Sequence, residues 1–241
     1  MIRDRWSNSA FVIVAHGDRG SAQRNRSLFA HRDCLRDRSN FKLVACCFIN
    51  GHPSIETVIA EAEQARCRDI LIYPFFMSSG YFATTALTAH LANVADDTHI
   101  KMLPPLGSAE QLPRLLLKRA IEATQTARFV IGETRLIIVG HGSSSNSGSR
   151  KATVGFAERA SRSSPFAEVS VAYLEEYPFL ADVLTKSNNP TVVAGFLCGA
   201  GIHGSFDIPT AVEAIATNAI YSGSIGTDRM IPSLILETLA D

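Results

Sequence analysis

The sequence lacks the excess of charge and the long apolar runs that are typical of nucleic-acid-binding and membrane proteins. Neither sign of charge is in excess, because 23 Lys and Arg residues balance 23 Asp and Glu residues, and such a chain has no global field to draw it to nucleic acid or an anionic membrane. Long apolar runs are missing, since MIRDRWSNSA leads only into the short apolar stretch 11–15, which is too short for a signal peptide or a membrane span. We therefore expect a soluble, cytoplasmic protein with no nucleic-acid or membrane partner.

Cysteine is scarce and not arranged in pairs. The five cysteines form no C-x-x-C motif and are odd in number, which argues against a disulfide framework and against a structural zinc site. The G-x-x-x-x-G-K-[ST] loop is also absent, which argues against a P-loop NTPase. The 241 residues are 46% hydrophobic, enough for one large packed domain or two small ones.

The chain contains an internal repeat. Residues 10–18 read AFVIVAHGD and residues 135–143 read RLIIVGHGS, so that His16 and His141 occupy equivalent positions 125 residues apart. The same offset aligns two further pairs, which are Asn50 with Glu175 and Pro53 with Pro178. A shared offset over such a length indicates a duplication, and a repeat of this kind decides how the whole fold is interpreted.

Two later segments continue the repeat with slightly smaller offsets. YPFFMSSGYF at residues 73–82 matches AGFLCGAGIH at residues 194–203, and LGSAEQLPRLL at residues 106–116 matches IGTDRMIPSLI at residues 225–235. Phe82 thus stands where the second copy has His203. The duplication therefore covers nearly the whole chain.

Each copy is predicted to alternate strands with helices. Short apolar runs that end in Gly-rich turns are typical of strands buried on both faces of a parallel sheet, and helical spacing follows both Pro53 and Pro178. We expect an α/β fold of two tandem related lobes, each with a parallel sheet flanked by helices. The N-terminal lobe is predicted at 1–132 and the C-terminal lobe at 133–241, with a cleft between them.

Polar residues follow the predicted strands in both copies. Ligands of open parallel sheets collect outside the carboxyl ends of the strands, and in the second copy these ends carry His141, His203 and either Glu175 or Glu176. Two imidazoles and a carboxylate suit a borderline divalent ion such as Co²⁺ or Fe²⁺, and they also accept protons near neutral pH. The first copy offers only His16, Asn50 and Phe82 at the matching positions, so its site is predicted to be degenerate.

These residues carry a resemblance to a known family. The strand followed by His-Gly-Ser, the strand that ends in Glu before a Pro-led helix, and GIHGSFDIP at residues 201–209 resemble the CbiX type of sirohydrochlorin chelatase, a class II chelatase. The resemblance implies an enzyme, a lyase that inserts Co²⁺ or Fe²⁺ into sirohydrochlorin without ATP and without a prosthetic group. The metal would be a substrate, and the product would serve cobalamin or sirohaem biosynthesis.

The resemblance also implies roles for individual residues. His141 and His203 would be catalytic and would hold the metal together with Glu175. His16 would be catalytic in an auxiliary way or would only orient the substrate, because the D-I-P element is Ala86-Leu87-Thr88 in the first copy.

Sirohydrochlorin is rich in peripheral carboxylates, which need hydrogen-bond donors or cations. The loop 142–151 offers Ser143, Ser144 and Arg150 at the predicted start of a helix. Arg19, Arg24 and Arg26 stand at the equivalent place of the first copy.

Several alternatives stay open at this point. Asp207 is most simply interpreted as a helix cap. A thiol hydrolase with Cys198 as nucleophile would need small residues two positions to either side, and Phe196 occupies one of them. A tetrapyrrole or metal carrier without catalysis is the alternative function. The residues do not decide which metal or tetrapyrrole is used, nor the oligomeric state, although the duplication is compatible with a monomer.

Overall fold

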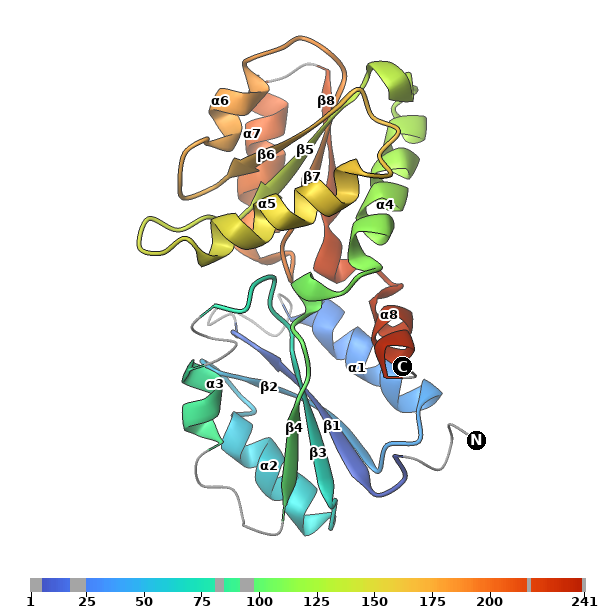
Figure 1. Cartoon of the computed structure of the whole chain (residues 1–241), viewed down its shortest axis with the longest axis vertical. Coiled ribbons are helices and arrows are strands. Elements are labelled where there is room, and N and C mark those ends of the chain that lie inside the picture. Colours follow the sequence, from blue (N-terminus) through green and yellow to red (C-terminus); the bar gives the residue numbers. More distant parts are fainter. Residues whose placement is uncertain (1–5, 18–24, 81–84, 92–97, 216–217, 240–241) are drawn as a thin grey trace. The chain divides into compact units, whose positions relative to one another are not determined.

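The computed structural model describes residues 6–17, 25–80, 85–91, 98–215 and 218–239, and it divides into two compact units (Figure 1). Unit 1 comprises Met1–Ala109 together with Arg229–Asp241, and unit 2 comprises Glu110–Asp228. Within the described ranges, no helix combines the length and apolar character that crossing a membrane requires.

Unit 1 is built on a four-stranded parallel sheet. Its strands are β1 (Ser9–Ala15), β2 (Leu43–Phe48), β3 (Asp69–Pro74) and β4 (His99–Met102), in the order β2-β1-β3-β4. The helices are α1 (Arg26–Arg38), α2 (Ile55–Gln64), α3 (Thr85–His90) and α8 (Ile231–Thr238). The central strand β1 is buried along nearly its whole length, as expected of a strand covered on both faces.

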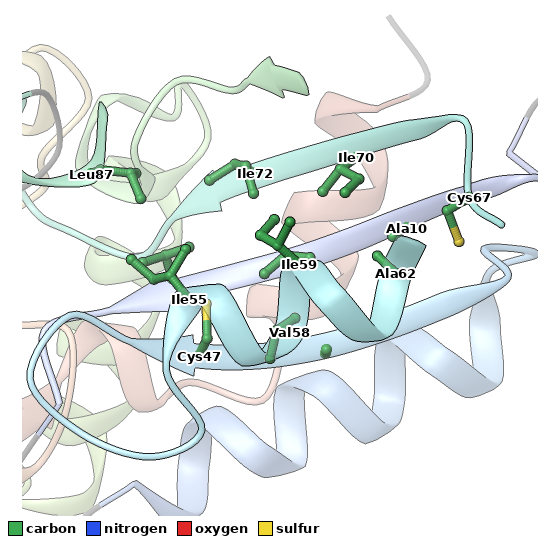
Figure 2. Packing of buried hydrophobic residues seen from close by; sticks show 13 residues of the cluster. Ala10, Cys47, Ile55, Val58, Ile59, Ala62, Cys67, Ile70, Ile72 and Leu87 are labelled. Carbon is green, nitrogen blue, oxygen red and sulfur yellow. The ribbon is translucent and has the colours of Figure 1, made fainter. Parts of the chain in front are cut away.

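The apolar stripe of α2 shows how this layer is held together. Ile55, Val58, Ile59 and Ala62 recur at helical spacing and are all buried, and they meet alternate side chains of the sheet such as Ile70 and Ile72 (Figure 2). The helix is capped by Ser54, whose hydroxyl accepts a hydrogen bond from the Thr57 backbone N–H. Capping and a one-sided apolar stripe thus fix the helix on the sheet.

Unit 2 repeats the architecture. Its strands are β5 (Arg135–Gly140), β6 (Glu168–Tyr173), β7 (Thr191–Gly195) and β8 (Ala219–Ser224), all parallel and in the order β6-β5-β7-β8. The helices are α4 (Leu112–Thr126), α5 (Gly148–Ser161), α6 (Leu180–Leu184) and α7 (Ile208–Ile215), with a π-helical turn at His203–Asp207. The two sheets have the same strand order, so the predicted fold of two related parallel lobes is confirmed.

The last helix of each copy belongs to a different unit from the strands that precede it in the sequence. Helix α4 follows β4 but packs on α5 and β7 in unit 2, whereas α8 follows β8 but packs on α1 in unit 1. In unit 1, Arg38 donates to the Ser233 hydroxyl at 2.8 Å. The boundaries of the compact units therefore differ from those of the sequence copies, which are 1–132 and 133–241. The difference arises because each of these two helices packs in the other copy's unit.

Two equivalent glycines close the loops after β3 and β7. The N–H of Gly107 donates to the Phe76 carbonyl, and the N–H of Gly226 donates to the Leu197 carbonyl, each at 3.0 Å. A Cβ at either position would lie 2.1 Å from a backbone oxygen, that of Met77 or of Cys198. Only glycine allows this close approach of two backbones.

Candidate metal-binding and catalytic site

Three side chains meet at the carboxyl edge of the unit 2 sheet. His141 follows β5, Glu175 follows β6 and His203 follows β7, and these three strands are neighbours in the order β6-β5-β7. His141 Nε2 lies 3.7 Å from Glu175 Oε1, and the rings of His141 and His203 are perpendicular with centroids 4.8 Å apart. The structure thus brings together the three residues that the repeat predicted to converge.

The spacing of this cluster fits a divalent ion held loosely. One ligand atom from each of the three residues lies within 4.8 Å of the other two, whereas two atoms bound at about 2.1 Å to one ion are at most ~4.2 Å apart. Because the side chains of His141 and Glu175 are about half exposed, small rotations close this difference. A set of three ligands would leave coordination positions open, so that a bound ion could exchange.

The backbone around His141 is arranged so that its ring faces this edge. Gly142 has a φ of +79°, and its carbonyl lies 3.0 Å from His141 Nδ1. The His141 carbonyl accepts the N–H groups of Leu174 and Glu175 at 3.2 and 3.0 Å. The loops after β5 and β6 are therefore tied together by main-chain hydrogen bonds, which hold the backbones of His141 and Glu175 next to each other.

His203 is held differently, by a carboxylate. Its Nδ1 lies 2.7 Å from Asp207 Oδ2, four residues further along the π-helical turn. Sequence reasoning missed this contact and treated Asp207 as a simple helix cap. Two signals in the sequence point to this contact. The His and the Asp are four residues apart on a helical segment, and both are missing from the first copy, where Phe82 and Ala86 stand.

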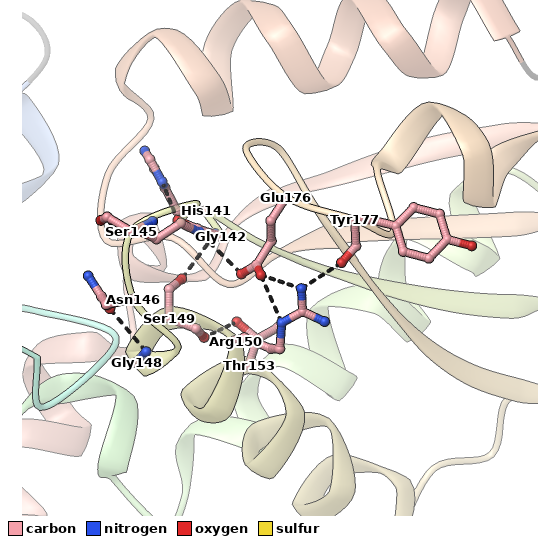
Figure 3. Close-up of polar contacts among 11 residues, drawn as sticks. His141, Gly142, Ser145, Asn146, Gly148, Ser149, Arg150, Thr153, Glu176 and Tyr177 are labelled. Atoms are coloured by element: carbon pink, nitrogen blue, oxygen red, sulfur yellow. Dashed lines mark hydrogen bonds and ion pairs between the residues drawn. The ribbon is translucent and has the colours of Figure 1, made fainter.

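The neighbouring acids Glu175 and Glu176 have different partners. Glu175 faces His141. The Glu176 carboxylate instead accepts hydrogen bonds from the Ser143 N–H at 3.1 Å and from Arg150 Nε at 2.8 Å (Figure 3). Arg150 Nη2 donates to the same carboxylate and, at 2.8 Å, to the carbonyl of Tyr177. The side chain of Glu176 is only 10% exposed, so this acid belongs to the support of the His141 loop.

Arg150, expected to bind a substrate carboxylate, is therefore already engaged. Its guanidinium lies 5.3 Å from the ring centroid of Tyr173, and the pKa of Tyr173 is raised because the phenol is buried, although Arg150 opposes that rise. The side chain of Arg150 nevertheless remains 44% exposed. A contact with an incoming ligand is compatible with this ion pair and stays a prediction.

The serine-rich loop after His141 is ordered by hydrogen bonds of its own. Ser149 Oγ accepts the Gly142 N–H at 3.0 Å, and Ser143 Oγ lies 2.9 Å from Ser145 Oγ (Figure 3). Ser144 is exposed. The loop is thus a defined structure at the start of α5, and Ser143 and Ser144 remain candidates for binding substrate carboxylates.

Unit 1 holds the degenerate counterpart. His16 Nδ1 lies 3.1 Å from the Gly17 carbonyl, and Asn50 Nδ2 lies 3.4 Å from His16 Nε2. The Asn50 N–H donates to the His16 carbonyl at 2.9 Å, as Glu175 does to His141, so the main-chain frame is kept while the carboxylate is lost. Phe82, Arg19 and Arg24 lie outside the described residues, and Arg26 is the exposed first residue of α1.

Two other chemistries fit this part of unit 2 poorly. Phe196 stands where a nucleophile elbow centred on Cys198 would need a small residue, and it is buried and stacked on Phe156 with ring centroids 4.2 Å apart. The glycines at 199, 201 and 204 have the G-x-G-x-x-G spacing of a dinucleotide-binding turn. A dinucleotide-binding turn follows the first strand of a βαβ unit. The glycines here follow β7 instead, and the segment continues into the π-helical turn that contains His203.

A curated relative resembles the chain over nearly its whole length. It is a probable sirohydrochlorin cobaltochelatase of Halobacterium salinarum, 26% identical over 271 residues, with 96% of this chain and 91% of the relative covered.

Two solved structures share the fold. The structure of CbiX, described as the terminal enzyme for sirohaem biosynthesis in denitrifying bacteria, superposes with a TM-score of 0.75 at 23% identity and covers 97% of this chain and 98% of its own. SirB from Bacillus subtilis with Fe³⁺ superposes with a TM-score of 0.83 at 18% identity and covers 97% of this chain and 94% of its own. The model of the CbiX family matches residues 10–123 and again residues 135–241, and the chain therefore belongs to the CbiX family.

Proposed function

We propose that this protein inserts a divalent metal, Co²⁺ or Fe²⁺, into sirohydrochlorin without ATP. The observation that carries the proposal is the cluster of His141, Glu175 and His203 at the carboxyl edge of the unit 2 sheet. Family membership and the cobaltochelatase relative support the choice of reaction. The metal is a substrate, and no prosthetic group is required by the chemistry.

Metal insertion makes two demands on a site. The ion must lose water and be handed on, which requires few and exchangeable ligands, and two pyrrole N–H protons must be accepted as the metal–nitrogen bonds form. We assign the metal ligands to His141, Glu175 and His203, and proton acceptance to whichever of these bases is released as the ion moves to the macrocycle. Neutral imidazoles near physiological pH serve both purposes.

The remaining roles follow from the local structure. Ser143 and Ser144 lie on the ordered loop beside His141, and Arg150 lies in the first turn of α5. We assign these three residues to the peripheral carboxylates of the macrocycle. His16, whose neighbour Asn50 carries no charge, is assigned an auxiliary role in orienting the substrate. We propose that a single chain suffices, and we place it in the cytoplasm, where cysteine thiols such as that of Cys34 stay reduced.

The test is metallation by the full-length apo-protein, followed by ultraviolet–visible absorption with sirohydrochlorin and Co²⁺, Fe²⁺ or Ni²⁺ in turn. We expect product in excess of one equivalent per chain, and loss of this turnover in His141→Ala and His203→Ala. His99→Ala, which changes an exposed histidine of β4, is the matched control and should retain full activity. Product that stops at one equivalent would identify a carrier instead of an enzyme.

A further inference from the structure

The two histidines of the cluster differ in what holds their Nδ1 atoms. His141 Nδ1 meets a backbone carbonyl, that of Gly142, at 3.0 Å, whereas His203 Nδ1 meets the carboxylate of Asp207 at 2.7 Å. An ionised carboxylate can accept hydrogen bonds but cannot donate them. In the neutral imidazole, Nδ1 of His203 therefore carries the proton, and Nε2 keeps the lone pair that a metal ion requires.

The hydrogen bond to Asp207 fixes the orientation of the His203 ring more than packing does. The ring of His203 also meets the ring of His141 edge to face, with centroids 4.8 Å apart. The side chains of His203 and Asp207 are nevertheless 37% and 40% exposed, so packing does not fix the imidazole by itself. Both residues lie on one π-helical turn, His203–Asp207, and the charge-assisted hydrogen bond joins its two ends. An exposed pair of this kind contributes little to stability, so its effect falls on the orientation of the ring.

The internal repeat supplies an independent observation. Phe82 aligns with His203, and Ala86 aligns with Asp207 at the same offset. The copy that lacks the histidine therefore also lacks the carboxylate. Asp207 has no helix start to cap, because the helical backbone continues unbroken from the π-helical turn into α7. A partner of the imidazole, in contrast, is useful only where the imidazole is present.

We propose that Asp207 is a positioning residue that holds His203 with Nε2 unprotonated and directed at the ion shared with His141 and Glu175. This inference rests on the proposed function, because it assigns Asp207 a task within the same site. Carboxylates that bind the second nitrogen of a ligating histidine act in this way, and their loss weakens metal binding by about 10- to 100-fold.

The variant that tests the inference is Asp207→Asn. An amide can turn its NH₂ group towards Nδ1, which places the histidine proton on Nε2 and removes the free lone pair. We expect Co²⁺ to bind the full-length apo-protein about tenfold or more weakly, with an altered visible Co²⁺ spectrum. We expect kcat for metallation to fall while KM for sirohydrochlorin and the melting temperature remain near wild type.

Asp207→Glu and Glu213→Gln complete the experiment. Asp207→Glu keeps a carboxylate and should retain more Co²⁺ affinity than Asp207→Asn. Glu213→Gln removes one negative charge from the exposed face of the adjacent helix α7 and should leave affinity and kcat unchanged. If Asp207→Asn kept the wild-type Co²⁺ affinity and kcat while His203→Ala was impaired, the role of Asp207 would be refuted and the proposed function would stand. Unchanged Co²⁺ binding in His203→Ala would overturn the site assignment as well.

Discussion

Glu175 and Glu176 are adjacent in the chain, yet the first faces His141 Nε2 at 3.7 Å and the second binds Arg150 Nε at 2.8 Å. One acid therefore belongs to the cluster, and the other holds the loop that carries His141. Replacing each by Gln should separate these two tasks.

In Glu175→Gln, we expect the Co²⁺ affinity of the apo-protein and its metallation rate to fall by about tenfold or more, because an anionic ligand is replaced by a neutral amide. The free energy of unfolding should change by less than about 0.5 kcal/mol, since this side chain is exposed. Isothermal titration with Co²⁺ and denaturant unfolding measure the two effects. A loss of stability without loss of affinity would assign Glu175 to the scaffold.

Glu176→Gln should show the opposite pattern. The Ser143 N–H can still bond to the amide oxygen, but Arg150 loses its anionic partner, so we expect unfolding to become easier by about 1–3 kcal/mol. The direct effect on Co²⁺ affinity should be smaller than in Glu175→Gln. Guanidinium unfolding of the two variants side by side provides the comparison, and equal stability of both would contradict the structural role of Glu176.

His141, His203 and His16 should differ in how strongly their replacement lowers metallation. We expect His141→Ala and His203→Ala to lower kcat/KM for metallation by about a hundredfold or more, the scale of a lost metal ligand or general base. His16→Ala should cost less and act mainly on KM, because His16 has Asn50 instead of a carboxylate as its neighbour. Steady-state kinetics of the three variants tests this order. A reversed order would move the reacting centre to unit 1.

Gly226 is expected to be intolerant of any side chain. In Gly226→Ala, the new Cβ would lie 2.1 Å from the Cys198 carbonyl oxygen, so the backbone must shift, at a cost of about 1–3 kcal/mol. Gly155→Ala is the control, because a Cβ there meets nothing within 4 Å and alanine favours the helix interior by about 0.5–1 kcal/mol. Thermal unfolding should show opposite shifts, and a Gly226→Ala protein as stable as wild type would exclude the close backbone contact.

A pH-dependent contact joins α2 and α3 in unit 1. The hydrogen bond from His90 Nδ1 to Glu56 Oε1, 2.6 Å long, lowers the pKa of Glu56 from 4.5 to about 2. A lowered acid pKa stabilises the fold above the unfolded value near 4.5, and this contribution is lost as the pH falls towards 2. A carbon-13 NMR titration should find the low pKa in the wild type and a return towards 4.5 in His90→Ala. An unchanged Glu56 titration in that variant would exclude the contact.

The repeat made most of the fold and the cluster predictable. Aligning His16 with His141 and Asn50 with Glu175 placed these residues at strand ends, and neighbouring parallel strands end at one edge. The choice between Glu175 and Glu176 could not be made, because it depends on Arg150, which lies on another element. The contact between Asp207 and His203 was missed because the π-helical turn that creates it leaves no periodic apolar pattern.

The place of α8 in unit 1 has a consequence for how the chain can be divided. Unit 2 is one continuous segment, Glu110–Asp228. Unit 1 needs a second segment, because Ile231, Leu234 and Ile235 of α8 are buried and this helix covers α1. A cut between residues 132 and 133 would therefore separate α8 from α1 and leave α4 without α5 and β7, so that neither sequence copy contains all the contacts of a complete unit.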